Sequence, residues 1–117
     1  MHEGAIAESI VDILKETKEA ENIDNIVKVR LKIGIMSGVM VDALLFALTA
    51  LKEEERIIKD TEFDVVETNV KAHCVLCNKD FYFKKGDDIS LLCNKCGMPL
   101  DIIEGKEMEI IDIEAEQ

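Results

Sequence analysis

The apolar and polar positions near the start of the chain repeat with the period of an α-helix. Between residues 5 and 20, apolar side chains recur three or four positions apart, and most charged side chains lie outside that stripe. The stripe consists of Ile6, Ile10, Ile13 and Leu14. A second run with helical spacing consists of Leu44, Leu45, Leu48 and Leu51. We therefore predict two amphipathic helices, the second beginning near Asp42 and ending in the charged residues 52–56.

Between these helices the apolar positions alternate with a period of two residues. The apolar side chains are Val27, Val29, Leu31 and Ile33, and the intervening ones are Lys28, Arg30 and Lys32. This alternation predicts a strand with one buried face and one basic, solvent-exposed face, ending at Gly34. β-branched and aromatic residues predict a second strand over 61–70. A third strand is predicted over 107–113, where a phase shift at Ile111 and Ile113 indicates either a bulge or a strand with both faces partly covered.

These elements predict an α+β fold with two helices packed on a small three-stranded sheet, antiparallel or mixed. Residues 1–70 would form this body, completed by a C-terminal strand within 105–117. Residues 71–104 would form an inserted zinc-ribbon-like module. Its larger core candidates are Phe81, Tyr82, Phe83, Ile89, Leu91 and Leu92. Such a small set is insufficient for about 35 residues to fold alone, so a bound metal would supply the missing stability.

Charge and hydropathy exclude several classes of partner. The 117 residues contain 14 Lys and Arg against 25 Asp and Glu, a net charge of −11 that repels nucleic acid and anionic lipid. The longest apolar stretch, residues 43–51, is far shorter than a membrane span. The first residues show no export signal. We therefore expect a cytoplasmic protein that binds neither nucleic acid nor membranes. The sequence leaves open whether it is a monomer or a homodimer.

Four cysteines carry the most specific chemical signal. Cys74 and Cys77 form one Cys-x-x-Cys pair, Cys93 and Cys96 form another, and 15 residues separate the pairs. This spacing is typical of a zinc site, because each pair can occupy two corners of a tetrahedron. The alternatives are two disulfides, a redox-active dithiol or iron held by four thiolates. A reducing compartment argues against the disulfides, and the matched pairs argue against a single redox motif.

A zinc ion held by four thiolates has no open position for substrate, so we expect Zn(II) to be structural. His73 adjoins the first pair and could compete as a ligand, although an exposed neighbour is the simpler interpretation. The chain offers no nucleophile and base arrangement and no phosphate-binding glycine loop. We therefore do not expect an enzyme.

The N-terminus has a second candidate metal site. His2 can present its imidazole together with the preceding backbone nitrogen and the terminal amine, a donor set that suits tetragonal Ni(II) or Cu(II). Glu3 can add a carboxylate or its own backbone nitrogen. Both have simpler interpretations: a terminal histidine is often frayed, and an acidic residue is favoured in the first turn of a helix.

Taken in order, several segments resemble the HypA/HybF family of hydrogenase nickel-incorporation proteins. They are Met1-His2-Glu3, Gly34-x-x-Ser37-Gly38-Val39 followed by residues 42–47, the two cysteine pairs, and residues 105–110. The resemblance implies a nickel metallochaperone for maturation of nickel-iron hydrogenase. It implies Ni(II) at His2 with Glu3 contributing, and structural Zn(II) at the four cysteines.

The resemblance also implies partners. These are a nickel-binding GTPase and the precursor of the hydrogenase large subunit, with a role in urease maturation in some members. This chain departs from many members by having Val41-Asp42 in place of Pro-Glu, so Asp42 is only a weak candidate for assisting nickel. The competing hypothesis is a zinc-ribbon interaction module that binds no nickel specifically.

Overall fold

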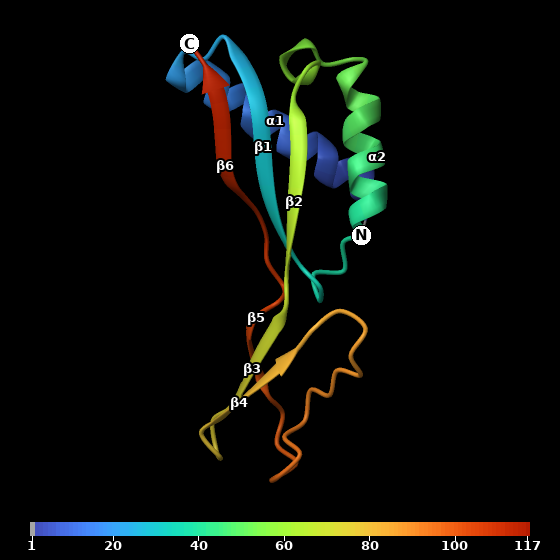
Figure 1. Cartoon of the computed structure of the whole chain (residues 1–117), viewed down its shortest axis with the longest axis vertical. Helices are drawn as coiled ribbons and strands as arrows, with labels where there is room; N and C mark the ends of the chain where they lie inside the picture. Colours follow the sequence, from blue (N-terminus) through green and yellow to red (C-terminus); the bar gives the residue numbers. More distant parts are fainter. Residues whose placement is uncertain (1) are drawn as a thin grey trace.

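The computed structural model describes residues 2–117 as an elongated molecule of 54 × 25 × 17 Å (Figure 1). The elements are α1 (Glu3–Glu21), β1 (Asn25–Gly34), α2 (Val41–Lys52), the short 3-10 helix η1 (Arg56–Ile58), β2 (Glu62–Thr68), β3 (Val70–Cys74), β4 (Lys79–Phe83), β5 (Asp101–Glu104) and β6 (Met108–Glu116). No helix in this described range is both long enough and apolar enough to span a bilayer.

The larger part of the molecule, which we call the body, is a three-stranded sheet covered by two helices. The strand order is β2-β1-β6, with β1 parallel to β2 and antiparallel to β6. Both helices lie on one side of this sheet (Figure 1). The fully buried large side chains of its core are Leu14, Val29, Ile33, Leu44, Leu48 and Ile58. The predicted α+β architecture is confirmed, and of the two sheet types that the sequence left open the sheet is the mixed one. Ile13 of the predicted stripe is exposed.

Two bulges set which side chains of the sheet face the core. On β6, Asp112 pairs with Arg30 and Ile110 pairs with Leu31, so Ile111 is the extra residue of the predicted bulge. On β1 the register also shifts, between Ile26 and Lys28. That second bulge makes Ile26 buried and leaves Val27 38% exposed, so the prediction that Val27 faces the core is wrong.

The basic outer face of β1 is covered by carboxylates from both neighbouring strands. Arg30 Nη1 lies 3.1 Å from Asp112 Oδ2, and Lys32 Nζ lies 3.9 Å from Glu109 Oε1. Lys28 is similarly within 4.0 Å of carboxylates on β2. Each exposed pair contributes little stability. Together they neutralise the only basic stripe that the alternation predicted, which leaves this face without an excess of positive charge.

The segment predicted as one strand over 61–70 is two strands in different sheets. β2 ends at Thr68 in the body, and β3 begins at Val70 in a second sheet of order β4-β3-β5. The break falls at Asn69, where the chain leaves β1 and acquires β4 and β5 as its neighbours. The prediction of a continuous strand is wrong because β propensity does not report a change of partner strand.

Direct backbone contacts join the body to the second sheet. N–H groups at the end of β1 and in the turn that follows donate to carbonyl oxygens of the two connecting segments. Gly34 N donates to Glu107 O at 2.8 Å, and Met36 N donates to Gly105 O at 2.7 Å. Ile35 N donates to Thr68 O at 3.0 Å. This turn is therefore clamped between the segments that enter and leave the module.

Candidate metal centres

The second sheet brings together the four cysteines that the sequence predicted as zinc ligands. Cys74 ends β3 and Cys77 lies in the turn that follows, whereas Cys93 and Cys96 lie in a turn before β5. Their four sulfur atoms all lie within 4.8 Å of one another. All four are free thiols rather than disulfides. One cluster is thus built from two turns far apart in the sequence.

The sulfur positions fit a tetrahedral metal site. A tetrahedron with Zn–S bonds of about 2.3 Å has sulfur atoms about 3.8 Å apart. The distance from Cys74 Sγ to Cys96 Sγ is 3.5 Å, and that from Cys77 Sγ to Cys93 Sγ is 3.9 Å. Both distances link one pair to the other, so the spacing is that of a single four-sulfur site. The donor set therefore fits zinc, with no position left for a substrate.

Backbone N–H groups point at these sulfur atoms. Cys77 N donates to Cys74 Sγ at 3.4 Å, and Lys95 N donates to Cys93 Sγ at 3.4 Å. The backbone N–H groups of Cys96 and Lys95 lower the pKa of the Cys93 thiol to about 6. In contrast, the neighbouring Cys96 side chain raises the pKa of Cys77 to about 12. Four crowded thiols cannot all ionise unaided, whereas a dication would stabilise all four thiolates.

The module has little core apart from this cluster. Its buried residues are Ala72, Cys74, Cys93 and Leu100, with Cys77, Phe81 and Ile102 packed against them. Three predicted core residues, Tyr82, Leu91 and Leu92, are instead exposed, and Tyr82 is 68% exposed. The prediction failed for them because the module is so thin that one face of each strand or turn meets solvent. Only Phe81 among the aromatic candidates joins the core.

His73 makes a contact away from the four sulfurs. Its Nδ1 lies 2.6 Å from Asp80 Oδ1, across the β3–β4 pair. It is not among the clustered side chains that could hold one metal in the described part of the chain. Its imidazole is therefore oriented by a carboxylate and is half-buried rather than the exposed neighbour that the simpler interpretation expected.

The N-terminal candidates lie at the start of α1. His2 is the N-cap residue of this helix and is exposed, and its carbonyl accepts Ile6 N at 3.1 Å. Glu3 Oε2 accepts the backbone N–H of Met40 at 3.1 Å. This hydrogen bond is the main cause that lowers the pKa of the Glu3 carboxyl. The terminal amine of Met1, the third nitrogen of the predicted donor set, lies outside the described residues.

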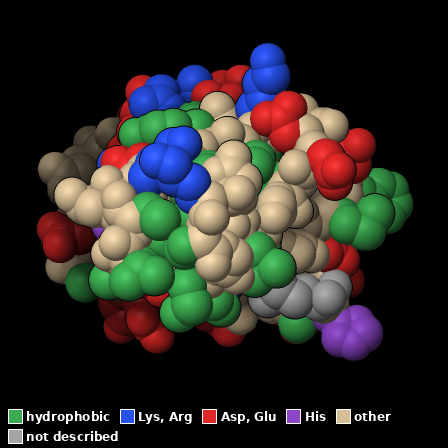
Figure 2. Space-filling model, turned by 90° about the horizontal axis from the view of Figure 1, so that it is seen from below, with side chains coloured by type: hydrophobic (Ala, Val, Ile, Leu, Met, Phe, Trp, Pro, Cys, Tyr) green, Lys and Arg blue, Asp and Glu red, His purple; other side chains and the backbone are tan. Residues whose placement is uncertain are grey.

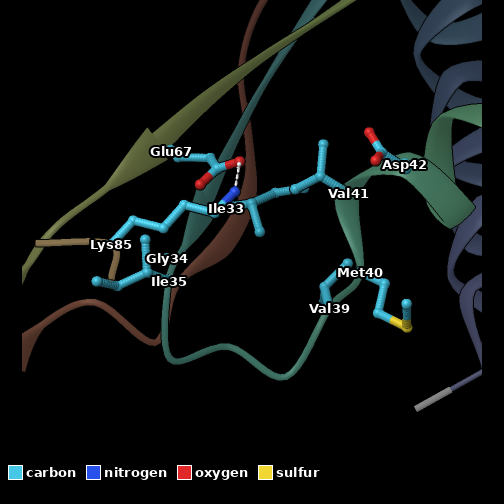
Figure 3. Close-up of a pocket in the computed structure, with 9 residues that line it drawn as sticks. All are labelled: Ile33, Gly34, Ile35, Val39, Met40, Val41, Asp42, Glu67 and Lys85. Atoms are coloured by element: carbon cyan, nitrogen blue, oxygen red, sulfur yellow. Dashed lines mark hydrogen bonds and ion pairs between the residues drawn. The ribbon is translucent and has the colours of Figure 1, made fainter. Parts of the chain in front are cut away.

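Met40, which holds Glu3, stands at the start of α2 and also lines a cavity. Met40 is the N-cap of α2, and Asp42 lies in the first turn of that helix. A cavity of about 280 Å³ is lined by Ile33, Gly34, Ile35, Val39, Met40, Val41, Asp42, Glu67 and Lys85. Figure 3 shows Met40 and Asp42 on the side formed by α2, and the ion pair of Lys85 with Glu67 on the other side. The weak candidate Asp42 is therefore near the residue that holds Glu3.

Comparison with known proteins gives a full-length match. The profile described as "Hydrogenase/urease nickel incorporation, metallochaperone, hypA" matches residues 1–115. The chain belongs to the HypA family. HypA proteins are metallochaperones and not enzymes, which confirms both the resemblance and the prediction that this chain is not catalytic.

Relatives and solved structures agree with this assignment. A "Hydrogenase maturation factor HypA" from Azotobacter chroococcum is 30% identical over 99% of this chain and 100% of its own length. Another from Moorella thermoacetica is 32% identical over the same shares. The solution structure of the Ni metallochaperone HypA from Helicobacter pylori has a TM-score of 0.71 at 25% identity, covering 99% of this chain and 98% of that one. The HypA fold is thus shared along the whole chain.

The contact between Glu3 and Met40 was not predicted from the sequence. Its donor is a backbone N–H group, which every residue other than proline carries, so the side chain of Met40 gives no signal. The contacts of Glu107 were not predicted either: its carboxylate accepts hydrogen bonds from Gly105 N, at 2.8 Å, and from the hydroxyl of Thr68. Both sets of contacts depend on segments that only the fold brings together.

Proposed function

We propose that this chain is a nickel metallochaperone that binds Ni(II) through His2 and Glu3 and delivers it to the precursor of a hydrogenase large subunit. The observation that carries the proposal is the anchored yet open N-terminus. The carboxylate of Glu3 is held by Met40 N, while the imidazole of His2 remains exposed. A cargo site needs this combination, because it must be preorganised for binding and accessible for release.

The backbone at this point supports nickel binding by nitrogen. The first N–H groups of a helix have no acceptor within the helix, so the backbone nitrogens of His2 and Glu3 are available. Together with the His2 imidazole and the terminal amine they offer the adjacent nitrogen donors that a tetragonal Ni(II) ion prefers. Each backbone nitrogen that binds the ion releases its proton. The Glu3 carboxylate is occupied by Met40 N, which favours a positioning role for it.

The location also supports moderate affinity. The N-terminal end of a helix carries a partial positive charge, which opposes a cation. The site is at the surface, so its ligands can be replaced one at a time by those of an acceptor. Both features favour the transfer of nickel to an acceptor over its storage on this chain.

For the four cysteines we propose structural Zn(II). The close sulfur spacing and the small core of the module support this role. We further propose that residues 71–104 form a separate zinc module, and that residues 1–70 with 105–117 form the nickel-binding body. In this scheme zinc holds the module in shape and takes no part in nickel coordination.

The family supplies the proposed partners. Its description names both hydrogenase and urease nickel incorporation, and its relatives are named hydrogenase maturation factors. We propose a nickel-binding GTPase as the partner that accompanies delivery and the hydrogenase large subunit as the acceptor. The free thiols favour a reducing, cytoplasmic location for this exchange.

The metal content of the untagged protein separates this proposal from a plain zinc-ribbon interaction module. The zinc-loaded protein is titrated with nickel by calorimetry, and both metals are then counted per chain by elemental analysis. The carrier should hold one zinc and one nickel, with zinc undisplaced. An interaction module would hold one zinc and no specific nickel, and this outcome would contradict the proposal.

A further inference from the structure

The two turns that carry the cysteines form the outer end of the module, which we call the tip and define as residues 74–79 and 91–100. The sulfur cluster holds these turns together. Within the second turn, Cys93 N donates to Met98 O and Leu100 N donates to Leu91 O, each at 2.8 Å. Leu91, Leu92 and Met98 therefore belong to one small folded-back loop. The tip is the lower end of the molecule in Figure 1.

Five large apolar side chains are exposed at the tip. The exposed fractions are 73% for Val75, 71% for Leu76, 45% for Leu91, 56% for Leu92 and 50% for Met98. Figure 2 looks onto this end of the molecule and shows apolar side chains gathered on it. Adjacent cysteine ligands fix the backbone of these loops, so their side chains cannot retreat into a core. None of the five belongs to the module core, which consists of Ala72, Cys74, Cys93 and Leu100 with Cys77, Phe81 and Ile102 packed against them.

The extent of this surface fits a transient partner better than a second copy of the chain. Five side chains at these exposures present on the order of 500 Å² of apolar area, the size of functional patches on monomeric proteins. A stable symmetric dimer requires about 800 Å² from each partner. A tip-to-tip dimer would also bring the lysines of both copies to one interface.

The tip differs in charge from the rest of the chain. Its sixteen residues contain no Asp or Glu, although the whole chain has 25, and they contain two lysines, Lys79 and Lys95. Residues 71–104 contain five lysines and five acidic residues, which cancel, so the net charge of −11 belongs to the body. Bound zinc with four thiolates would add a formal charge of −2, which the two lysines balance, so the tip is formally neutral on an otherwise acidic chain. Two of the thiols, Cys74 and Cys93, are buried, Cys77 is half-buried and Cys96 is exposed. Both ammonium groups are at the surface.

We propose that the tip is a docking surface for a partner protein segment that presents apolar side chains flanked by carboxylates. The apolar part of the segment would cover Leu76 and Leu92, and its carboxylates would face Lys79 and Lys95. Neither lysine forms an ion pair within residues 2–117, so both ammonium groups can meet a carboxylate of the partner. Lys79 Nζ lies over the Phe81 ring, 5.2 Å from its centroid, which leaves its solvent side open to that carboxylate. Docking here leaves His2, at the start of α1 in the body, uncovered.

The test uses two synthetic amphipathic peptides of equal length, with leucines on one face and either glutamates or lysines on the other. Each is titrated into the untagged, zinc-loaded protein at physiological ionic strength, and amide chemical shifts are followed by NMR. The glutamate peptide should shift signals of residues 74–79 and 91–100 and bind at least tenfold more tightly than the lysine peptide. The net charge of −11 by itself favours the lysine peptide, so a preference for the glutamate peptide would have to come from the tip.

Variants then separate the apolar contribution to peptide binding from the electrostatic contribution. Leu76→Gln and Leu92→Gln should each weaken the glutamate peptide at least fivefold, whereas Phe46→Gln, at a 76% exposed position on α2, should not. Lys95→Glu should abolish the preference for glutamate, which tests the proposal even if a leucine variant loses zinc. The proposal is overturned if neither peptide binds the tip, or if the lysine peptide binds it equally well. It is also overturned if the tip signals shift with protein concentration alone, since a second copy would then be the occupant.

Discussion

Gly34 and Gly105 are in direct backbone contact where the body meets the zinc module. A Cβ atom on Gly34 would overlap the carbonyl group of Gly105. The same carbonyl accepts Met36 N at 2.7 Å, and Gly105 itself has a φ of +120°. The absence of a side chain at Gly34 therefore allows the end of β1 to pack against the segment that returns from the module.

Gly34→Ala should destabilise the protein by roughly 2 to 3 kcal/mol, because the clashing atoms are backbone and cannot rotate away. Urea unfolding of the zinc-loaded protein measures this loss. Gly4→Ala is the matched control, since a Cβ there meets nothing within 4 Å and the position is helical. Equal unfolding midpoints for Gly34→Ala and wild type would contradict the close contact.

Glu107 predicts a pH dependence of stability at the same junction. The pKa of the Glu107 carboxyl is held below its usual value of 4.5, mainly by the hydrogen bond from the hydroxyl of Thr68 and further by that from the N–H of Gly105. A lowered folded-state pKa stabilises the protein above the unfolded-state pKa, and this contribution disappears as the pH falls through the folded-state pKa. The free energy of unfolding should therefore fall below about pH 4.5, and Glu107→Gln should reduce that fall.

Glu109→Gln serves as the control for this measurement. It removes a carboxylate two residues away, which forms an ion pair with Lys32 at the surface. Its stability curve should keep the acid-dependent fall of the wild type. If both variants give the same curve as wild type between pH 3 and 7, Glu107 does not stabilise the junction.

Much of the body could be predicted from local pattern. The helical stripes gave both helices, and the phase shift at Ile111 indicated the bulge that the β6 register contains. The failures occurred where tertiary contacts decide. No residue near Val27 marks the second bulge, and Asn69 lies within a run of strand-forming residues although the chain changes sheets there. Periodicity reports which face is buried, whereas partner strands are chosen by the whole fold.

The candidate sites were predictable to different degrees. Cysteine spacing predicted the four-sulfur cluster because the ligands themselves define the motif. At the N-terminus, the donor types of His2 and Glu3 could be identified from the sequence, but the hydrogen bond that holds Glu3 could not. The Met40 contact depends on α1 and α2 lying side by side, which is a property of the packed body.

Cys74→Ser should release zinc and disorder residues 71–104 while the body stays folded. Zinc contributes about 10 to 16 kcal/mol to the folding of comparable peptides, and the module core is too small to replace it. Zinc per chain and amide spectra measure the two effects. His73→Ala should retain one zinc, because its imidazole contacts Asp80. A tightly held zinc in Cys74→Ser would exclude Cys74 as a ligand.

Substitution of Glu3 tests whether its carboxylate positions the N-terminus or binds nickel. Glu3→Gln keeps an oxygen acceptor for Met40 N, whereas Glu3→Ala removes it. We expect the glutamine variant to retain nickel affinity within about twofold and the alanine variant to lose about three- to tenfold. Glu16→Ala removes the same charge elsewhere on α1 and should have no effect. Equal losses for both Glu3 variants would indicate direct coordination by the carboxylate.

Calorimetric titration of nickel into untagged wild type, His2→Ala and His73→Ala tests the central claim most directly. The chain contains only these two histidines, so each variant is the control for the other. The His73→Ala protein should bind one nickel as wild type does, whereas His2→Ala should lose the specific binding isotherm and keep its zinc. If His2→Ala binds nickel with the stoichiometry and affinity of wild type, nickel is not held at the N-terminus.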